Sequence, residues 1–230
     1  MARDYLDSGT KYRVVGGFLS PVSDGYKKKG LLPTLHRVPM CKLSIKDSDW
    51  IDVDTWEAEE PEWTRTKVVL ETIEERVNKK EIRDKYTNGR KIKVMMVSGG
   101  DLVGSFLTPG LWDQEDLRDI INKFGLLIIE RHGTDLSEVV DQSPLLQEFS
   151  VWLFFSFLFF FLLNKCCSFS FAVFLSLQEH IHIIHQPIKN DLSSTRVRSL
   201  LSQGQSVRYL VPDGTCNYIA QHGLYKVLPN

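Results

Sequence analysis

Near the C-terminal end of the sequence, one short segment combines residue types that hold phosphate groups. It reads Asn190-Asp191-Leu192-Ser193-Ser194-Thr195-Arg196-Val197-Arg198. Hydroxyl residues at a helix start cap free backbone N–H groups, and the positive end of the helix dipole favours an anion. Arg198 follows Thr195 by three residues, so on a helix both side chains can face one phosphate chain. The segment therefore predicts a helix start that binds phosphate.

Two other polar segments follow predicted strands, where ligands of α/β proteins bind. A loop with three lysines, residues 20–29, comes after the predicted strand 12–18. Such a loop suits phosphate, although a solvated charged surface is the plainer alternative. Gly99-Gly100-Asp101 comes after the predicted strand 92–97. Its glycines allow close backbone approach and its carboxylate suits a ribose diol, whereas the alternative is a simple turn.

Tryptophans and histidines are the other candidates. Leu111-Trp112 follows a Pro-Gly pair, and three more tryptophans lie within residues 48–65. A loop tryptophan can stack on a flat ring, or it can be a half-buried packing residue. His180 and His182 alternate on a predicted strand, but no carboxylate or cysteine completes a metal set, so we expect no metal site there. No Ser/His/Asp or Cys/His arrangement can be singled out.

The composition limits the classes of protein to consider. A length of 230 residues suits one domain. With 28 basic and 29 acidic residues, the chain has no general positive field that would attract nucleic acid. The four cysteines form no CxxC pair, which favours a reducing compartment over a disulfide framework. The first residues contain no apolar signal segment. We therefore expect a protein of the cytoplasm or nucleus; a homo-oligomer is compatible with the sequence.

Predicted strands and helices alternate, which indicates an α/β protein with a mainly parallel sheet and helices on both faces. The expected strands are residues 12–18, 50–53, 92–97, 126–129 and 181–184. The expected helices are residues 64–78, 115–124, the segment after Ser193 and an aromatic helix within 207–225, and residues 79–90 are expected to be an exposed charged run.

Taken together, these segments resemble the eukaryotic nicotinamide/nicotinate mononucleotide adenylyltransferases. The resemblance rests on Ser20 to Leu31, His36-Arg37-Val38, Val53 to Glu57 with Glu62-Trp63, Gly99-Gly100-Asp101, Leu111-Trp112, Asn190 to Arg198 and Gln205 to Asp213, in the family's order. It implies a single Rossmann-like nucleotidyltransferase domain over residues 1–230. It also implies adenylyl transfer from ATP, with Mg²⁺, to either mononucleotide, giving NAD or its deamido form and pyrophosphate.

The resemblance also implies roles for individual residues. Lys28 and Arg198 would be catalytic. ATP would be bound by Gly99, Asp101, Asn190, Thr195, Arg196 and Arg198. The mononucleotide would be bound by Tyr26, Trp63, Thr66, Leu111, Trp112 and Arg131, with Trp63 and Trp112 on either side of the pyridine ring. No resident metal ligand is implied.

The sequence departs from the family's pattern in two places. The family opens with a strand and a Gly-Ser-Phe-Asn-Pro loop that this sequence lacks, and Met1 to Leu6 aligns with the end of the following helix. We therefore expect a fold without the family's first strand, as in an N-terminally truncated product. The alternative to an enzyme is a catalytically inactive nucleotide-binding fragment.

The second departure is an apolar insertion, residues 151–178, which is rich in Phe and Leu. Joining Ser150 to Glu179 restores the family's spacing, and we interpret the insertion as a retained intron. Its uninterrupted apolar part, residues 151–163, is shorter than the roughly 20 residues that cross a bilayer. A membrane tether through residues 151–177 remains the alternative, at the cost of burying Lys165.

Overall fold

In the computed structural model, the described residues are 1–130, 139, 141–146, 180–188, 190 and 192–225. The chain divides into two compact units. Unit 1 consists of residues 1–13 and 70–190, and unit 2 of residues 14–69 and 191–230. The single domain expected from the sequence stays a prediction. The insertion at residues 151–178 lies outside the described residues.

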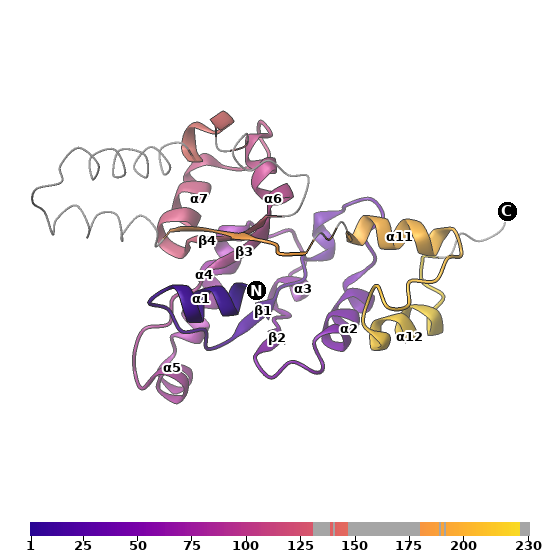
Figure 1. The fold of residues 1–230 in the computed structure, drawn as a ribbon, viewed down its shortest axis with the longest axis horizontal. Helices are drawn as coiled ribbons and strands as arrows, with labels where there is room; N and C mark the ends of the chain where they lie inside the picture. The colour runs from indigo at the N-terminus through magenta and orange to yellow at the C-terminus, as the bar shows by residue number, and fades with distance from the viewer. Residues whose placement is uncertain (131–138, 140, 147–179, 189, 191, 226–230) are drawn as a thin grey trace, which may run out of the picture. The chain divides into compact units, whose positions relative to one another are not determined.

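Unit 1 is built on a three-stranded parallel sheet of order β3-β4-β5 (Figure 1). Its strands are β3 (Met96–Gly99), β4 (Leu126–Glu130) and β5 (Ile181–His185). Val97 lies beside Leu127 and Leu127 beside His182, so these three side chains share one face. The central strand, β4, is buried at Leu126, Leu127 and Ile128, as expected for a continuous apolar run in a parallel sheet.

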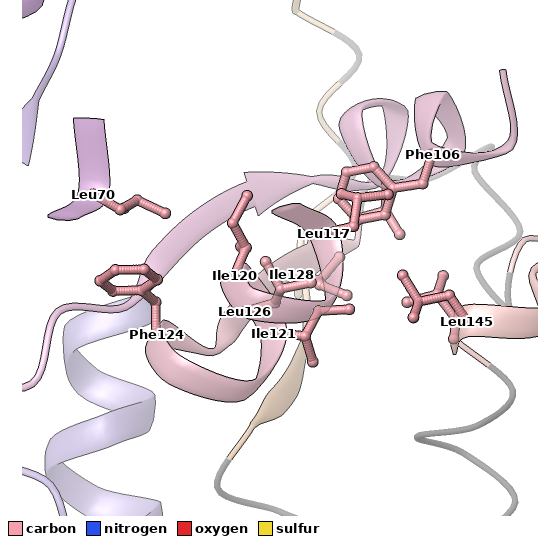
Figure 2. Packing of buried hydrophobic residues seen from close by; sticks show 11 residues of the cluster. Leu70, Phe106, Leu117, Ile120, Ile121, Phe124, Leu126, Ile128 and Leu145 are labelled. Atoms are coloured by element: carbon pink, nitrogen blue, oxygen red, sulfur yellow. The ribbon is translucent and has the colours of Figure 1, made fainter. Parts of the chain in front are cut away.

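Unit 1 also contains several helices. They are α1 (Ala2–Gly9), most of α4 (Thr66–Val77), α5 (Lys80–Thr87), α6 (Gly100–Gly104), the short turn η2 (Ser105–Leu107), α7 (Gln114–Asp119) and the π-helical turn η3 (Ile120–Phe124). Of these, α6 contacts β3 and β4. Figure 2 shows the core that α4, α6, η2, α7 and η3 share with β4, which extends from Leu70 on α4 to Leu145. Phe124, Ile121 and Val103 are fully buried in it.

Unit 2 contains a two-stranded parallel sheet of β1 (Gly17–Leu19) and β2 (Ile51–Val53). Its helical elements are η1 (Asp24–Tyr26), α2 (Thr34–Ser44), α3 (Trp56–Glu59), α11 (Ser194–Ser202) and α12 (Asp213–Gln221). Helix α12 packs against α2, where Gly214 lies against Leu43 and the Thr215 hydroxyl donates to the Met40 carbonyl at 3.3 Å. The aromatic helix predicted within residues 207–225 is therefore present, and it packs on α2.

The α/β class and the parallel pairing are confirmed, but several boundaries differ from the prediction. The expected strands 12–18 and 92–97 pair only from Gly17 and Met96 onward. Helix α1 lies where the resemblance aligns Met1 to Leu6 with the end of a helix, whereas α2 and α3 were not predicted. Residues 80–87 of the charged run form α5, whose residues are all at least partly exposed. Among the described residues, no helix is both long and apolar enough to cross a membrane.

A candidate nucleotide site described unit by unit

In unit 2, the start of α11 has the capping geometry that the sequence predicts. The Ser193 hydroxyl oxygen accepts a hydrogen bond from the Arg196 backbone N–H at 3.2 Å, and Ser193 itself is extended, as an N-cap should be. Thr195 and Arg196 are exposed. The Arg198 guanidinium donates to the Thr195 hydroxyl at 3.2 Å. The arrangement offers hydroxyl, guanidinium and helix-end donors to one anion.

The lysine loop of unit 2 is shaped by η1 and by a turn at Lys27. Lys27 has a left-handed backbone conformation (φ 51°), and its N–H donates to the Asp24 carbonyl at 3.2 Å. This turn leaves Tyr26 and Lys28 exposed. The Tyr26 and Trp63 rings lie 6.3 Å apart between centroids, with 33° between their planes. Two residues predicted to bind the mononucleotide are therefore neighbours, and both keep accessible faces.

Beneath this loop, unit 2 buries three charged side chains: Arg37, Asp54 and Glu57. The Ser20 hydroxyl donates to Glu57 at 2.7 Å. Burial raises the pKa of Glu57, and this effect outweighs the lowering by the Ser20 hydrogen bond and by the Arg37 charge. Partial burial acts to raise the pKa of Asp24 as well, but hydrogen bonds from Arg37 and Thr34 hold that pKa below its usual value. The sequence did not single out Asp24, Asp54 or Glu57, because residue type alone does not show whether an acidic side chain is buried or hydrogen-bonded.

In unit 1, β3 ends at Gly99, and α6 begins at the next residue, so Gly99 is the N-cap of that helix. A side chain built on Gly99 would meet nothing within 4 Å, which leaves room for a ligand over this backbone. Asp101 lies exposed in the first turn of α6. The Gly-Gly-Asp segment is thus a strand-to-helix junction, the position expected for a nucleotide-binding residue in an α/β protein.

Trp112 of unit 1 makes a hydrogen bond and a ring contact within its own unit. Its indole N–H donates to the Ser105 hydroxyl at 3.0 Å, and its ring meets Phe106 edge to face, 5.1 Å between centroids. The side chain is only partly buried, and the neighbouring Leu111 is 52% exposed. Trp112 is therefore a packing residue that is held by one edge and keeps part of its surface accessible.

The other predicted residues take the following positions. Thr66 is the first residue of α4 and partly buried, and Asn190 is exposed before α11. Arg131 lies outside the described residues. Lys28, Tyr26, Trp63, Thr66, Thr195, Arg196 and Arg198 belong to unit 2, and Gly99, Asp101, Leu111, Trp112 and Asn190 to unit 1.

His182 of β5 and His180, just before that strand, have structural partners. His182 is buried, its Nδ1 lies 3.4 Å from the Tyr5 hydroxyl, and its ring meets Tyr5 and Tyr12 edge to face. His180 lies 3.2 Å from the Ile121 carbonyl. Within the part of the chain that the structure describes, no group of three or more His, Cys, Asp or Glu side chains could hold a metal ion.

Sequence reasoning also missed a cavity of about 480 Å³ in unit 2. Side chains of α11, α12 and the segment between them line it, including Leu201, Val207, Cys216 and Ile219. None of the predicted site residues lines this cavity. It shares helix α11 with Thr195, Arg196 and Arg198, but its lining comes from the C-terminal part of that helix and from α12.

Comparison with known proteins agrees with the resemblance. Residues 1–200 match the cytidylyltransferase-like family model. The chain is 34% identical to nicotinamide/nicotinic acid mononucleotide adenylyltransferase 1 of Bos taurus, an alignment that covers 98% of this chain and 81% of that protein. It is 36% identical to the Arabidopsis thaliana enzyme, over 99% and 82% of the two chains. It is 38% identical to the Schizosaccharomyces pombe enzyme, of which it spans about half, 55%.

A solved structure of similar fold supports the architecture. The nicotinic acid mononucleotide adenylyltransferase of Plasmodium falciparum, complexed with APC, has a TM-score of 0.55 and 16% identity, over 98% of this chain and 88% of that one. At this identity the likeness shows the fold alone. The family match and the relatives above 30% identity show more: this chain belongs to the nicotinamide/nicotinic acid mononucleotide adenylyltransferases, within the cytidylyltransferase-like family.

Proposed function

We propose that the protein transfers the adenylyl group of ATP to nicotinamide or nicotinate mononucleotide, a step of NAD biosynthesis. A phosphate oxygen of the mononucleotide forms a bond to the α-phosphorus of ATP. The bond from that phosphorus to the oxygen bridging to the β-phosphate breaks, and pyrophosphate leaves. The attacking phosphate is already ionised, so catalysis requires positioning and charge neutralisation rather than a general base.

The observation that carries this proposal is the start of α11. Hydrogen-bond donors gather there from the capped helix end, the Thr195 hydroxyl and the Arg198 guanidinium. Nη2 of Arg198 lies 3.2 Å from Oγ1 of Thr195. Developing negative charge on a transferring phosphoryl group is stabilised by such donors, and an arginine can bind two of its oxygens at once. We assign Arg198 and Lys28 to the reacting phosphates, and Thr195, Arg196 and Asn190 to the rest of the ATP.

The remaining contacts are assigned to the sugar and the rings. We propose that Gly99 and Asp101 bind the ATP ribose. Trp63 and Trp112 would stack on the pyridine ring of the mononucleotide. Tyr26, Thr66 and Leu111 would lie around that ring, and Arg131 would also bind the mononucleotide. Mg²⁺ supplies further charge neutralisation on the triphosphate when it is bound. The hydroxyl and guanidinium groups at α11 suit phosphate oxygens rather than a metal ion, so we expect Mg²⁺ to arrive with ATP.

The experiment is a paired measurement of binding and turnover on the purified chain. Calorimetric titration with each mononucleotide and with ATP reports binding, and a coupled dehydrogenase assay with ATP, Mg²⁺ and nicotinamide mononucleotide reports NAD. We expect binding of both substrates and NAD formation that depends on both. Binding without NAD formation would reject the enzyme and leave a nucleotide-binding protein, and absence of binding would reject both.

A further inference from the structure

Two residues predicted to contact the mononucleotide, Tyr26 and Trp63, lie on exposed segments that need support. Tyr26 ends the short η1 turn, and Trp63 lies in an irregular segment before α4. Their side chains are 41% and 49% exposed, so their own burial fixes neither position. Something beneath them must set the 6.3 Å separation of their rings.

Arg37 of α2 ties together the two ends of the loop that carries Tyr26. Its Nε donates to the Leu32 carbonyl at 2.7 Å, and its Nη2 donates to the Val22 carbonyl at 2.5 Å and to the Asp24 carboxylate at 3.0 Å. Arg37 is 9% exposed. The planar guanidinium places its donors in a fixed fork, so these carbonyls are held at a defined separation.

Asp24 completes this arrangement from the loop side. Its carboxylate also accepts hydrogen bonds from the Thr34 backbone N–H at 2.8 Å and from the Thr34 hydroxyl at 3.0 Å. The start of α2 is thereby joined to η1, although α2 has no side-chain cap from its own N-cap residue, Pro33. The loop is thus fixed to α2 through one buried cation and one carboxylate.

The same loop is joined directly to the backbone beside Trp63. Ser23 is completely buried, and its hydroxyl donates to the Glu62 carbonyl at 2.9 Å. Two residues later, a Cβ on Gly25 would lie 2.5 Å from the Trp63 backbone nitrogen and 2.7 Å from the Glu62 carbonyl carbon. The two segments therefore touch through backbone atoms, and only glycine fits at position 25.

We propose that Arg37 and Ser23 are positioning residues that set the spacing of Tyr26 and Trp63, and thereby the affinity for the pyridine mononucleotide but not for ATP. This inference rests on the proposed function. Arg37 acts through the Val22, Asp24 and Leu32 contacts, and Ser23 through the Glu62 carbonyl. Neither side chain is exposed enough to meet a ligand of its own, which distinguishes both from Lys28 on the same loop.

Arg37→Lys is the decisive variant, because it keeps the charge and removes the fork. Affinity for nicotinamide mononucleotide and for ATP is measured by calorimetry on the full chain, with KM and kcat wherever turnover is present. We expect mononucleotide affinity to fall about tenfold, the size of a lost hydrogen bond to a charged group, and ATP affinity to change less than about twofold. Arg83→Lys on α5, a partly exposed arginine paired with Asp84, is the matched control.

The outcomes separate this inference from the proposed function. If the unchanged protein binds no mononucleotide, the proposed function fails, and this inference with it. If the unchanged protein does bind, two results for Arg37→Lys overturn the positioning role while the function stands. One is unchanged affinity for both ligands, and the other is an equal loss of affinity for both. If Arg37→Lys does not fold, Ser23→Ala is the deciding variant. A fall of about threefold or more in the affinity for the mononucleotide alone supports the positioning role. Unchanged affinities, or equal losses of affinity for both ligands, overturn it.

Discussion

The Arg198 guanidinium donates a hydrogen bond to the Thr195 hydroxyl at 3.2 Å, three residues earlier on α11. Both residues lie in the first turns of the helix, close to the Ser193 cap. This hydrogen bond holds the arginine beside the helix end, so little side-chain freedom would be lost on binding phosphate. Pre-organised donors of this kind are the main source of catalysis expected for a phosphate nucleophile.

The first prediction concerns this pair. Arg198→Ala should lower kcat about 100-fold, because the charge that it faces develops on the transferring phosphate, whereas mononucleotide affinity should change little. Arg198→Lys should retain part of the rate, since it keeps charge without the fork. Steady-state kinetics with Arg83→Ala as control tests this. An unchanged kcat in Arg198→Ala would show that the phosphate assignment is wrong.

A second prediction concerns the two roles of Trp112. Trp112→Phe keeps an aromatic contact with Phe106 but loses the hydrogen bond to Ser105, and Trp112→Ala loses both. We expect the free energy of unfolding to fall by about 1 kcal/mol in the first variant and about 2–3 kcal/mol in the second. Denaturant unfolding of the three proteins measures these differences in the free energy of unfolding. Equal stability of all three proteins would mean that the packing contact contributes nothing.

The same pair of variants separates packing from stacking. In Trp112→Ala, mononucleotide binding should weaken by about 1–3 kcal/mol, the range for a lost ring-stacking contact, while Trp112→Phe should lose less. Calorimetry below the unfolding temperature of each variant is the measurement. Full mononucleotide affinity in a folded Trp112→Ala protein would remove this residue from the pyridine site.

Gly25→Ala should destabilise unit 2. The added methyl group would overlap the backbone of Glu62 and Trp63, which cannot yield as a flexible side chain can. We expect a loss of about 1–3 kcal/mol in the free energy of unfolding, the usual range for overpacking. Gly9→Ala is the control: nothing lies within 4 Å of its added Cβ, and alanine favours the end of α1. A fully stable Gly25→Ala variant would contradict the backbone contact.

The buried Glu57 predicts a pH dependence of stability. Burial raises its pKa in the folded state above the unfolded value of 4.5, so between these two values the folded state binds more protons. Its contribution to stability therefore falls as pH rises through that interval. Glu57→Gln carries no such charge, yet its amide oxygen can still accept from Ser20. The stability of Glu57→Gln relative to the unchanged protein should increase as the pH rises above 4.5.

Thermal unfolding across that pH range tests the effect, with Glu59→Gln as the control on the same helix. Glu59 is exposed, so its replacement controls for the loss of a surface charge on this helix. If the two variants behave alike, Glu57 is not the buried acid that the geometry indicates.

Local spacing predicted much of the helix start at α11, since capping and an i, i+3 contact depend on neighbouring residues alone. The strands β4 and β5 could likewise be predicted from a local pattern, because each is a short run rich in apolar residues. Helix α2 was missed because Pro33 precedes it and Pro39 lies inside it, and proline usually argues against a helix interior. Helix α5 was missed because its residues alternate charge without an apolar stripe.

The support beneath the site could not be predicted in the same way. Arg37 stands in the His36-Arg37-Val38 motif, yet its side chain contacts the carbonyls of Val22 and Leu32. Nothing in its residue type distinguishes a buried arginine that organises a loop from a surface arginine. The necessity of Gly25 likewise depends on the backbone at Glu62 and Trp63, which is distant along the chain.

The most direct test of the account follows the atoms of ATP. The purified chain is incubated with Mg²⁺, nicotinamide mononucleotide and ATP labelled in its α-phosphate in one reaction, or in its γ-phosphate in another. The account predicts that the α-label enters the dinucleotide and that the γ-label leaves in pyrophosphate, in equal amounts. An α-label that stays in ATP or is released as AMP, with no labelled dinucleotide, would contradict adenylyl transfer by this protein.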